Sequence, residues 1–319
     1  MKRVTAVLLL IAMALAMCAW SPAAADPRER YAVEENTAEN KATYPYIVRT
    51  ESSTWYLSAD DIALLGEEAF FDGLYEILQY QEEDFADARA ALAGFIPEEI
   101  ESINIYTDFC GKAGVSEVAG AYYNPRGNFI KVFRGWQITG FTLLHEYVHY
   151  LTLHCAENPV AFGLFAEGIA DYVTKILCRN RMMRACSRYV SEEEAAFLKA
   201  HGVWDEEEDC VDPRLYWFGR AQSFALGQAM GEEYMCTQDV WVFRTEEIQQ
   251  NPTAENISHM EAACIVAYLA ETHSREEVFS HMNMDPADLE QVFGEAFPEL
   301  YEHWLEWNTA YCEEQGIIM

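Results

Sequence analysis

The sequence predicts an α+β fold with a small, mostly antiparallel sheet, a buried helix beneath it and a helical C-terminal lobe. Two observations predict the sheet. Residues 102–109 alternate isoleucine with polar residues, as a half-buried strand does, and residues 129–133 form a second short strand after an Asn-Pro-Arg-Gly-Asn turn. A third observation predicts the helical lobe, because most segments after residue 139 carry apolar residues at three- and four-residue spacings.

The predicted elements follow one another in a simple order. Residues 26–58 are polar and charged and are interpreted as an N-terminal lead-in. We expect a single domain over residues 59–315, with a strand-and-helix lobe at 59–180 and a helical lobe at 181–315. Helices are expected at 59–93, 140–154, 161–178, 214–230, 255–271, 275–281 and 286–312, with loops or caps at 191–194 and 205–213.

Composition excludes several classes of protein. Hydrophobic residues make up 51% of the chain and aromatic residues 13%, which supplies a core and argues against disorder. The net charge of -32, from 53 acidic and 21 basic residues, repels phosphate backbones and anionic headgroups. Nucleic acid is therefore not an expected partner, whereas a cationic substrate is compatible with this charge. Acidity also keeps an exported protein soluble, which is the simpler interpretation.

The start of the chain has the pattern of a signal peptide. A basic start and an apolar run over residues 4–19 precede small residues that end at Ala25. We therefore expect a secreted or extracytoplasmic protein that is cleaved after Ala25. A lipid anchor at Cys18 is the alternative, although Met17 is bulky for a lipoprotein processing site. No later segment is long and apolar enough to predict a membrane span.

Cysteine usage favours the same compartment. The chain has nine cysteines, and Cys18 lies in the predicted leader, which leaves eight. An even number in an exported chain predicts disulfides, whose connectivity stays open. Zinc ligation by thiolates is the rival interpretation, but the chain has no Cys-x-x-Cys pair.

The central motif is His-Glu-Tyr-Val-His at residues 145–149. Residues four apart lie on one face of a helix, so His145 and His149 can bind one zinc ion. Glu146 lies beside the first ligand and can act as general base on the water that zinc activates. Apart from histidines, Glu146 is the only acidic or basic residue over 141–154. Because an unpaired buried carboxylate is costly, its place in this apolar helix indicates a function.

A second segment supplies a third ligand. Phe-Ala-Glu-Gly-Ile-Ala-Asp-Tyr occupies residues 165–172, and seventeen residues separate Glu167 from His149. If a second helix folds back against the first, Glu167 completes a site of two histidines and one glutamate with one open position. Asp171, one turn later, is placed to accept a hydrogen bond from the second ring nitrogen of His145. The sequence thus predicts one Zn²⁺ per chain.

These two motifs resemble those of the gluzincin metallopeptidases, the group that contains thermolysin and the aminopeptidase N family. Its short peptidase MA-like proteins look most similar, over residues 100–310. In this group the glutamate of the second motif is the third zinc ligand, and the acid four residues later supports a histidine. The resemblance implies these roles for Glu167 and Asp171, together with a gluzincin catalytic fold and a peptide or protein substrate.

A weaker resemblance concerns the substrate strand. Gly120, Ala121, Tyr122, Tyr123 and Asn124 fall where aminopeptidase N relatives carry a Gly-x-Met-Glu-Asn strand that pairs with the substrate backbone. Tyr123 stands in place of the glutamate that binds a free N-terminal amine in those relatives. Strict aminopeptidase activity is therefore not expected. An ordinary tyrosine-rich edge strand is the alternative.

A second weak resemblance supplies an oxyanion donor. Tyr216 begins a Tyr-Trp-Phe-Gly segment similar to the Tyr-x-x-Gly of the same relatives, whose tyrosine hydroxyl stabilises the tetrahedral oxyanion. One such donor contributes about 3–4 kcal/mol in comparable sites. A packed core tyrosine is the alternative. The remaining histidines are interpreted as surface or capping residues: His154, His201, His259, His273, His281 and His303.

The functional prediction is an exported zinc metallopeptidase in which Glu146 is the general base and no covalent intermediate forms. One alternative is a non-catalytic, zinc-stabilised binding or scaffold protein at the cell surface. Another is a helical structural protein without metal. Zinc content distinguishes the metal-free structural protein from the two zinc proteins. Peptide cleavage distinguishes the metallopeptidase from the binding or scaffold protein.

Overall fold

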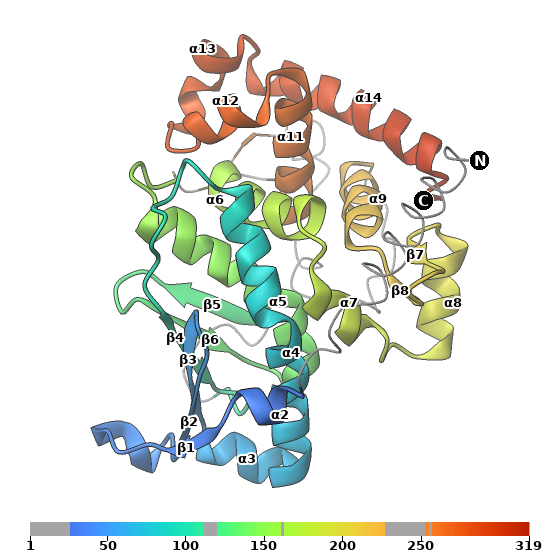
Figure 1. Cartoon of the computed structure of the whole chain (residues 1–319). Coiled ribbons are helices and arrows are strands. Elements are labelled where there is room, and N and C mark those ends of the chain that lie inside the picture. Colours follow the sequence, from blue (N-terminus) through green and yellow to red (C-terminus); the bar gives the residue numbers. More distant parts are fainter. Residues whose placement is uncertain (1–25, 112–119, 161–162, 227–252, 255–256, 319) are drawn as a thin grey trace, which may run out of the picture.

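The structure is a computed structural model that describes residues 26–111, 120–160, 163–226, 253–254 and 257–318. The predicted leader, with Cys18 and the cleavage site after Ala25, lies outside these residues. A six-stranded sheet lies toward one end of the molecule and helices α11 to α14 lie at the other (Figure 1). Across the described ranges, no helix combines the length and the apolar character that crossing a membrane requires.

The main sheet is mixed. Its order is β1-β2-β3-β4-β6-β5, in which β1–β2, β2–β3 and β5–β6 are antiparallel and β3–β4 and β4–β6 are parallel. The prediction of a mostly antiparallel sheet is therefore confirmed only in part. Parallel neighbours need a long crossover, and a helical segment joins β3 to β4. The bounds are β1 Val33–Glu35, β2 Tyr46–Arg49, β3 Ser53–Leu57, β4 Ile103–Thr107, β5 Ala121–Asn124 and β6 Phe129–Val132.

Residues 26–58 belong to the fold, so the prediction of a lead-in is wrong. They hold α2 (Pro27–Arg30), the 3-10 helix η1 (Glu39–Ala42) and three strands of the sheet. Trp55 and Leu57 of β3 are completely buried. The two short runs that form β2 and β3, of four and five residues, are too short to give a clear periodic signal.

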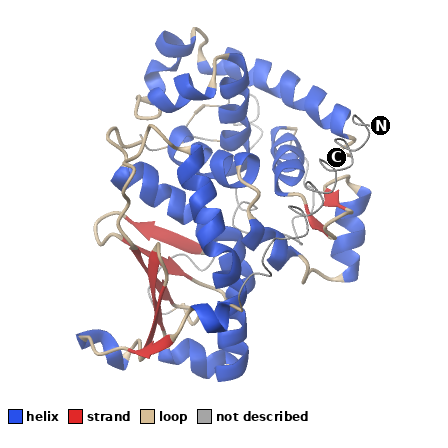
Figure 2. Cartoon of the chain, viewed as in Figure 1, coloured by secondary structure: helices blue, strands red, loops and turns tan. Residues whose placement is uncertain are grey.

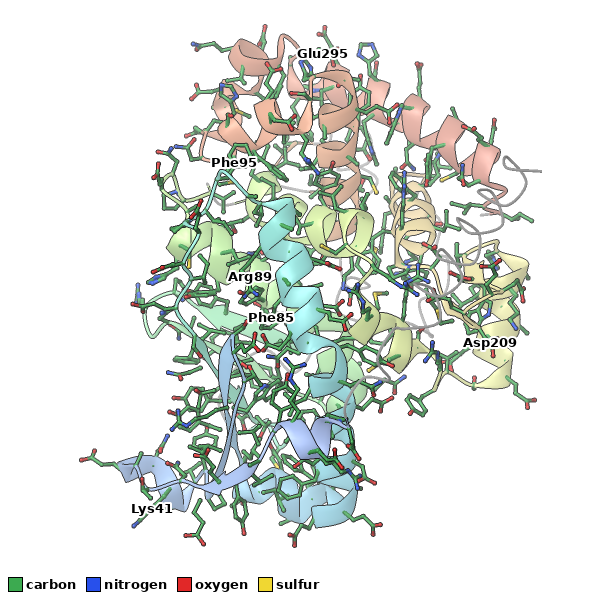
Figure 3. All side chains as sticks on the ribbon, in the orientation of Figure 1. Lys41, Phe85, Arg89, Phe95, Asp209 and Glu295 are labelled. Carbon is green, nitrogen blue, oxygen red and sulfur yellow. The ribbon has the colours of Figure 1, made fainter. Side chains whose placement is uncertain are left out.

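The first long helical segment divides in two. Gly66 adopts a φ of 82°, which L-residues rarely adopt, and separates α3 (Ala59–Leu65) from α4 (Glu67–Ala91). Helix α4 packs against α5 (Trp136–Tyr150), and α5 lies against β5 and β6. Phe85 of α4 stacks on Tyr147 with ring centroids 3.7 Å apart, and Arg89 donates a hydrogen bond to the Tyr147 hydroxyl. Figure 3 labels Phe85 and Arg89 along α4.

Most of the remaining chain is helical, as predicted. Helices α5 and α6 (Leu164–Asp171) each end in a π-helical turn, η2 (Leu151–Cys155) and η3 (Tyr172–Leu177). A small hairpin of β7 (Trp204–Asp205) and β8 (Cys210–Val211) overlaps the predicted 205–213 loop region and begins one residue before it. The other elements are α7 Arg181–Ser187, α8 Glu192–Ala200, α9 Pro213–Ala225, α11 His259–Thr272, α12 Arg275–Ser280, η5 Pro286–Asp288, α13 Leu289–Phe293 and α14 Phe297–Gln315.

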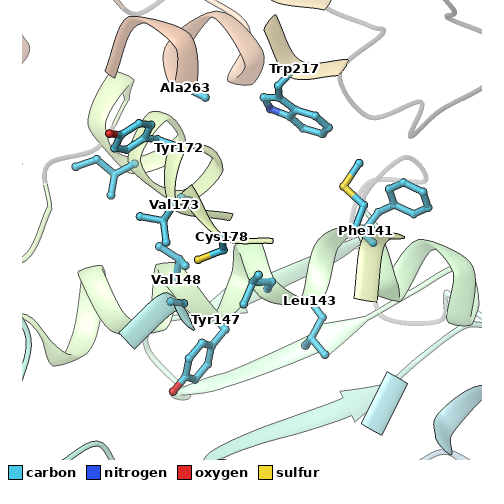
Figure 4. Close-up of a cluster of buried hydrophobic side chains, with 14 of the residues drawn as sticks. Phe141, Leu143, Tyr147, Val148, Tyr172, Val173, Cys178, Trp217 and Ala263 are labelled. Carbon is cyan, nitrogen blue, oxygen red and sulfur yellow. The ribbon is translucent and has the colours of Figure 1, made fainter. Parts of the chain in front are cut away.

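The core joins the sheet to the helices through α5. Figure 2 shows the main strands gathered on one side of the helices. On the other side, side chains of α5, η3, α9 and α11 form one buried cluster (Figure 4). Helix α5 supplies Phe141, Leu143 and Val148, and Trp217 comes from α9. Because α5 is enclosed on both sides, the side chains that it carries have little freedom to move.

The predicted disulfides are not found among the described residues. Seven cysteines are described, and no disulfide joins any two of them. Most are buried, where a thiol packs as a small apolar side chain. Burial raises the pKa of the Cys178, Cys186 and Cys312 thiols to about 12, so they stay protonated at neutral pH. Cys236 lies outside the described residues.

Candidate metal centre

Helix α5 carries the first motif in a fully enclosed position. Its residues from Thr139 to Tyr150 are all buried. His145, Glu146 and His149 are 9%, 8% and 7% exposed. Their i, i+1 and i+4 spacing, on a helix that packs between the sheet and α6, brings both imidazoles to the same place. The two rings lie with centroids 4.5 Å apart and almost perpendicular.

The structure brings the predicted third ligand to the two histidines. Glu167 Oε2 lies 3.1 Å from His145 Nε2 and 3.2 Å from His149 Nε2. The three potential ligand atoms all lie within 4.8 Å of one another. Glu167 belongs to α6, which folds back against α5 as predicted. His145, His149 and Glu167 therefore form a group that could hold a metal ion.

Asp171 lies directly behind His145. Its Oδ1 is 2.6 Å from His145 Nδ1, and the carboxylate is 3% exposed. Because the Asp171 carboxylate contacts Nδ1 of His145, it fixes the tautomer of the ring and leaves Nε2 directed at Glu167. The equivalent atom of the second histidine, His149 Nδ1, is buried with no hydrogen-bond partner among the described residues. The two predicted ligand histidines are thus supported differently.

Electrostatics within the cluster keeps both carboxyl groups charged. Burial acts to raise the pKa of Glu167, but hydrogen bonds with His145 and His149 hold it below its usual value. Burial opposes ionisation of Asp171 in the same way, and the adjacent His145 ring holds the pKa of that carboxyl down. Burial acts to lower the pKa of His145, but the Asp171 charge raises it well above the usual value. The two carboxylates therefore stay ionised beside the two imidazoles.

Glu146 points toward the edge of the sheet. Its Oε2 accepts a hydrogen bond of 2.6 Å from the backbone N–H of Tyr123 in β5. Strand β5 is the last strand of the main sheet on the side of α5. The Tyr123 side chain is 7% exposed and donates its hydroxyl to Asn128 at 3.0 Å. At this position the strand thus presents its backbone to Glu146, while the tyrosine ring packs in the core.

The predicted strand from Gly120 to Asn124 agrees closely with β5. Gly120 lies just before it, and its carbonyl accepts a hydrogen bond from Phe133 N at 2.7 Å. Ala121 pairs with Val132, and Asn124 pairs with Phe129. The Tyr122 ring lies on the opposite face of the strand from Tyr123 and stacks on Phe133, with centroids 5.8 Å apart. The backbone of this strand therefore adjoins the candidate metal centre.

Tyr216 lies in the core of the helical lobe. It is 1% exposed, and its hydroxyl accepts a hydrogen bond of 3.0 Å from Arg220. Its neighbour Trp217 makes the contact with the cluster, because the indole Nε1 donates to Asp171 Oδ2 at 3.1 Å. Sequence reasoning singled out the segment for Tyr216 and assigned no role to Trp217.

His259 lies beside the cluster, although the sequence suggested only a surface or capping residue. Its Nδ1 is 3.7 Å from Glu167 Oε2, and its ring is parallel to that of His145 at 6.0 Å. The side chain is 43% exposed. Ser258 and Glu261 form a capping box that begins α11 at His259. The capping box predicts from the sequence that a helix begins near His259. It does not predict which element that helix packs against.

Gly168 permits the close approach of α11 to α6. A Cβ atom at this position would lie 2.9 Å from the Ala262 carbonyl oxygen and 2.9 Å from Val266 Cγ2. Real Cβ atoms essentially never approach other atoms so closely. The glycine that follows Glu167 therefore lets α11 pack on α6 and brings His259 to the centre.

Comparisons with protein families, with curated proteins and with solved structures find no match for this chain.

Proposed function

We propose that this chain is an exported zinc metallopeptidase of the gluzincin type that its motifs resemble. The observation that carries the proposal is the convergence of His145 Nε2, His149 Nε2 and Glu167 Oε2 in one partly buried cluster. A carboxylate that suits a general base, Glu146, comes from the same helix as the two histidines.

Zinc fits the donor set and its spacing. Two imidazole nitrogens and one carboxylate oxygen are the protein ligands of many catalytic zinc sites, which keep a fourth position open. In a tetrahedral site with bonds of about 2.1 Å, neighbouring ligand atoms lie about 3.4 Å apart. The 3.1 and 3.2 Å separations of the two histidines from Glu167 are close to that value. The fit supports one zinc ion per chain.

Glu146 carries the proton transfer in this proposal. Zinc, when bound, supplies a Lewis acid that polarises a carbonyl and makes water more acidic. Glu146 accepts the proton of the attacking water and passes it to the leaving amine. The Tyr123 amide holds Oε2 of Glu146 at 2.6 Å, which orients the carboxylate.

His259 joins Tyr216 as a candidate oxyanion donor. The Tyr216 hydroxyl is buried and engaged by Arg220. The His259 ring is partly exposed and lies beside Glu167. An oxyanion donor must reach the carbonyl oxygen of a substrate that is bound beside the metal ligands. The exposed position of His259 next to Glu167 suits this role better than the buried position of Tyr216.

The edge strand favours binding of an extended peptide. Strand β5 ends the sheet, and an edge strand can pair with the backbone of an added strand. Tyr123 provides no charge there, because burial raises the pKa of its phenol to about 12. Without an anchor for a free amine, internal cleavage of peptides is the expected activity.

Cleavage of a peptide library, with and without a chelator, tests this function. We expect chelator-sensitive cleavage that is restored by zinc. A folded protein that binds zinc but cleaves no peptide would instead support the zinc-stabilised binding or scaffold protein at the cell surface. A folded protein that binds no zinc would contradict both.

A further inference from the structure

Both oxygens of Asp171 are engaged by ring nitrogens from different helices. Oδ1 contacts His145 Nδ1 at 2.6 Å, and Oδ2 accepts a hydrogen bond of 3.1 Å from Trp217 Nε1. Trp217 lies 46 residues after Asp171 and is 3% exposed. A carboxylate that is held at both oxygens cannot rotate without losing one of these hydrogen bonds. The indole therefore limits the orientations open to Asp171, and through it those of His145.

A buried lysine lies over the face of the indole. Lys175 is 3% exposed, and its Nζ lies 4.9 Å from the centroid of the Trp217 ring. The same ammonium group donates a hydrogen bond to the carbonyl oxygen of Phe141, one turn before His145 on α5. Lys175 thus joins the indole to the helix that carries both histidines. Figure 4 labels Phe141 and Trp217 in this part of the core.

We propose that Trp217 is a positioning residue of the metal centre, held in place by Lys175, which keeps Asp171 aligned on His145. This inference rests on the proposed function, because it assumes that His145 is a metal ligand. The indole touches neither the substrate nor the metal, and it acts only through Asp171. Loss of a group that hydrogen-bonds a ligand ring directly, as Asp171 does, typically lowers metal affinity about 10–100-fold, so the loss of Trp217, one step further out, should fall at the lower end of that range.

The chain offers a matched control for the loss of an indole. Trp304 of α14 is completely buried, and its Nε1 has no hydrogen-bond partner among the described residues. Trp217→Phe and Trp304→Phe therefore remove the same atoms from two buried positions, but only the first removes a hydrogen bond to Asp171. A third variant, Lys175→Met, keeps the aliphatic stem and removes the charge beside the indole.

The experiment measures zinc affinity of the full chain by competition with a chromophoric chelator at one pH, with thermal unfolding of the metal-free proteins as the folding check. We expect Trp217→Phe to weaken zinc binding about 10-fold, the lower end of the range for loss of a ligand's own partner, and Trp304→Phe to leave it unchanged. Lys175→Met should weaken it less than Trp217→Phe does.

The outcomes separate this inference from the proposed function. Equal zinc affinity of Trp217→Phe and Trp304→Phe, with wild-type zinc binding intact, would overturn the positioning role and leave the proposed function standing. A wild-type chain that binds no zinc would overturn both. If Trp217→Phe does not fold, Lys175→Met decides the question, and wild-type affinity in that variant would overturn the inference.

Discussion

The two walls of the candidate metal centre differ in how firmly they are held. Helix α5 is buried from Thr139 to Tyr150, between the sheet and three other helices. The opposite wall, formed by α6 and α11, is open at two side chains, because Glu167 and His259 are 35% and 43% exposed while the rest of α6 is buried. Helix α5 is therefore the fixed platform of the site, and the exposed side chains of α6 and α11 mark where solvent reaches the centre.

A change on the buried wall should have the largest effect on catalysis. Glu146→Gln keeps the shape of the side chain but cannot accept a proton, so kcat should fall by about 10²–10⁴-fold. Zinc content should stay the same, because the three proposed ligands are untouched. The matched control is Glu157→Gln, the same change at an exposed residue beyond η2. Unchanged turnover in Glu146→Gln would remove this residue from the mechanism.

A change on the open wall should have a smaller effect. His259→Ala should lower kcat by about 10²-fold, the lower end of the range for loss of one oxyanion donor, because the side chain is partly exposed. Zinc content should be retained. His303→Ala is the control, since His303 is also exposed and lies 3.2 Å from a glutamate, Glu295. If His259→Ala and His303→Ala have the same kcat, His259 is not an oxyanion donor, and α11 contributes only by covering the centre.

The close contact between α6 and α11 should contribute to the stability of the fold. Gly168→Ala places a methyl group against the Ala262 carbonyl and Val266, and should lower the free energy of unfolding by about 1–3 kcal/mol. Urea unfolding of the metal-free protein measures this loss. Because α11 carries His259, activity should fall as well while zinc is retained. A variant as stable as wild type would show that the two helices can separate without cost.

The smallest effect on kcat/KM is expected from acetylation of the substrate's N-terminus. The β5 backbone adjoins Glu146, and the buried Tyr123 phenol supplies no negative charge for a free amine. We therefore expect similar kcat/KM for a peptide with a free and an acetylated N-terminus. A strong preference for free amines, with stepwise release of single residues, would show that another acid binds the amine.

Local spacing made half of the centre predictable. His145, Glu146 and His149 lie within five residues of one helix, so helical geometry alone brings them together. Glu167 required a second helix to fold back, and the resemblance of both motifs to a known family supplied that expectation. In the structure, the Glu167 carboxylate lies 3.1 Å from His145 Nε2 and 3.2 Å from His149 Nε2.

The other residues of the centre depend on tertiary packing that no local pattern encodes. Trp217 reaches Asp171 because α9 packs on η3, and His259 reaches Glu167 because α11 packs closely at Gly168. The first three strands were missed for a related reason. Their short apolar runs gain stability from pairing with strands elsewhere in the sheet, and Trp55 is buried only in that context.

Zinc content tests the central claim most directly. Metal analysis of the full chain, purified without added zinc, should give about one equivalent for the wild type. His149→Ala removes one of the three proposed ligands and should lose most of that zinc while remaining folded. A wild-type protein that is well folded and free of metal, and stays so when zinc is supplied, would contradict the account.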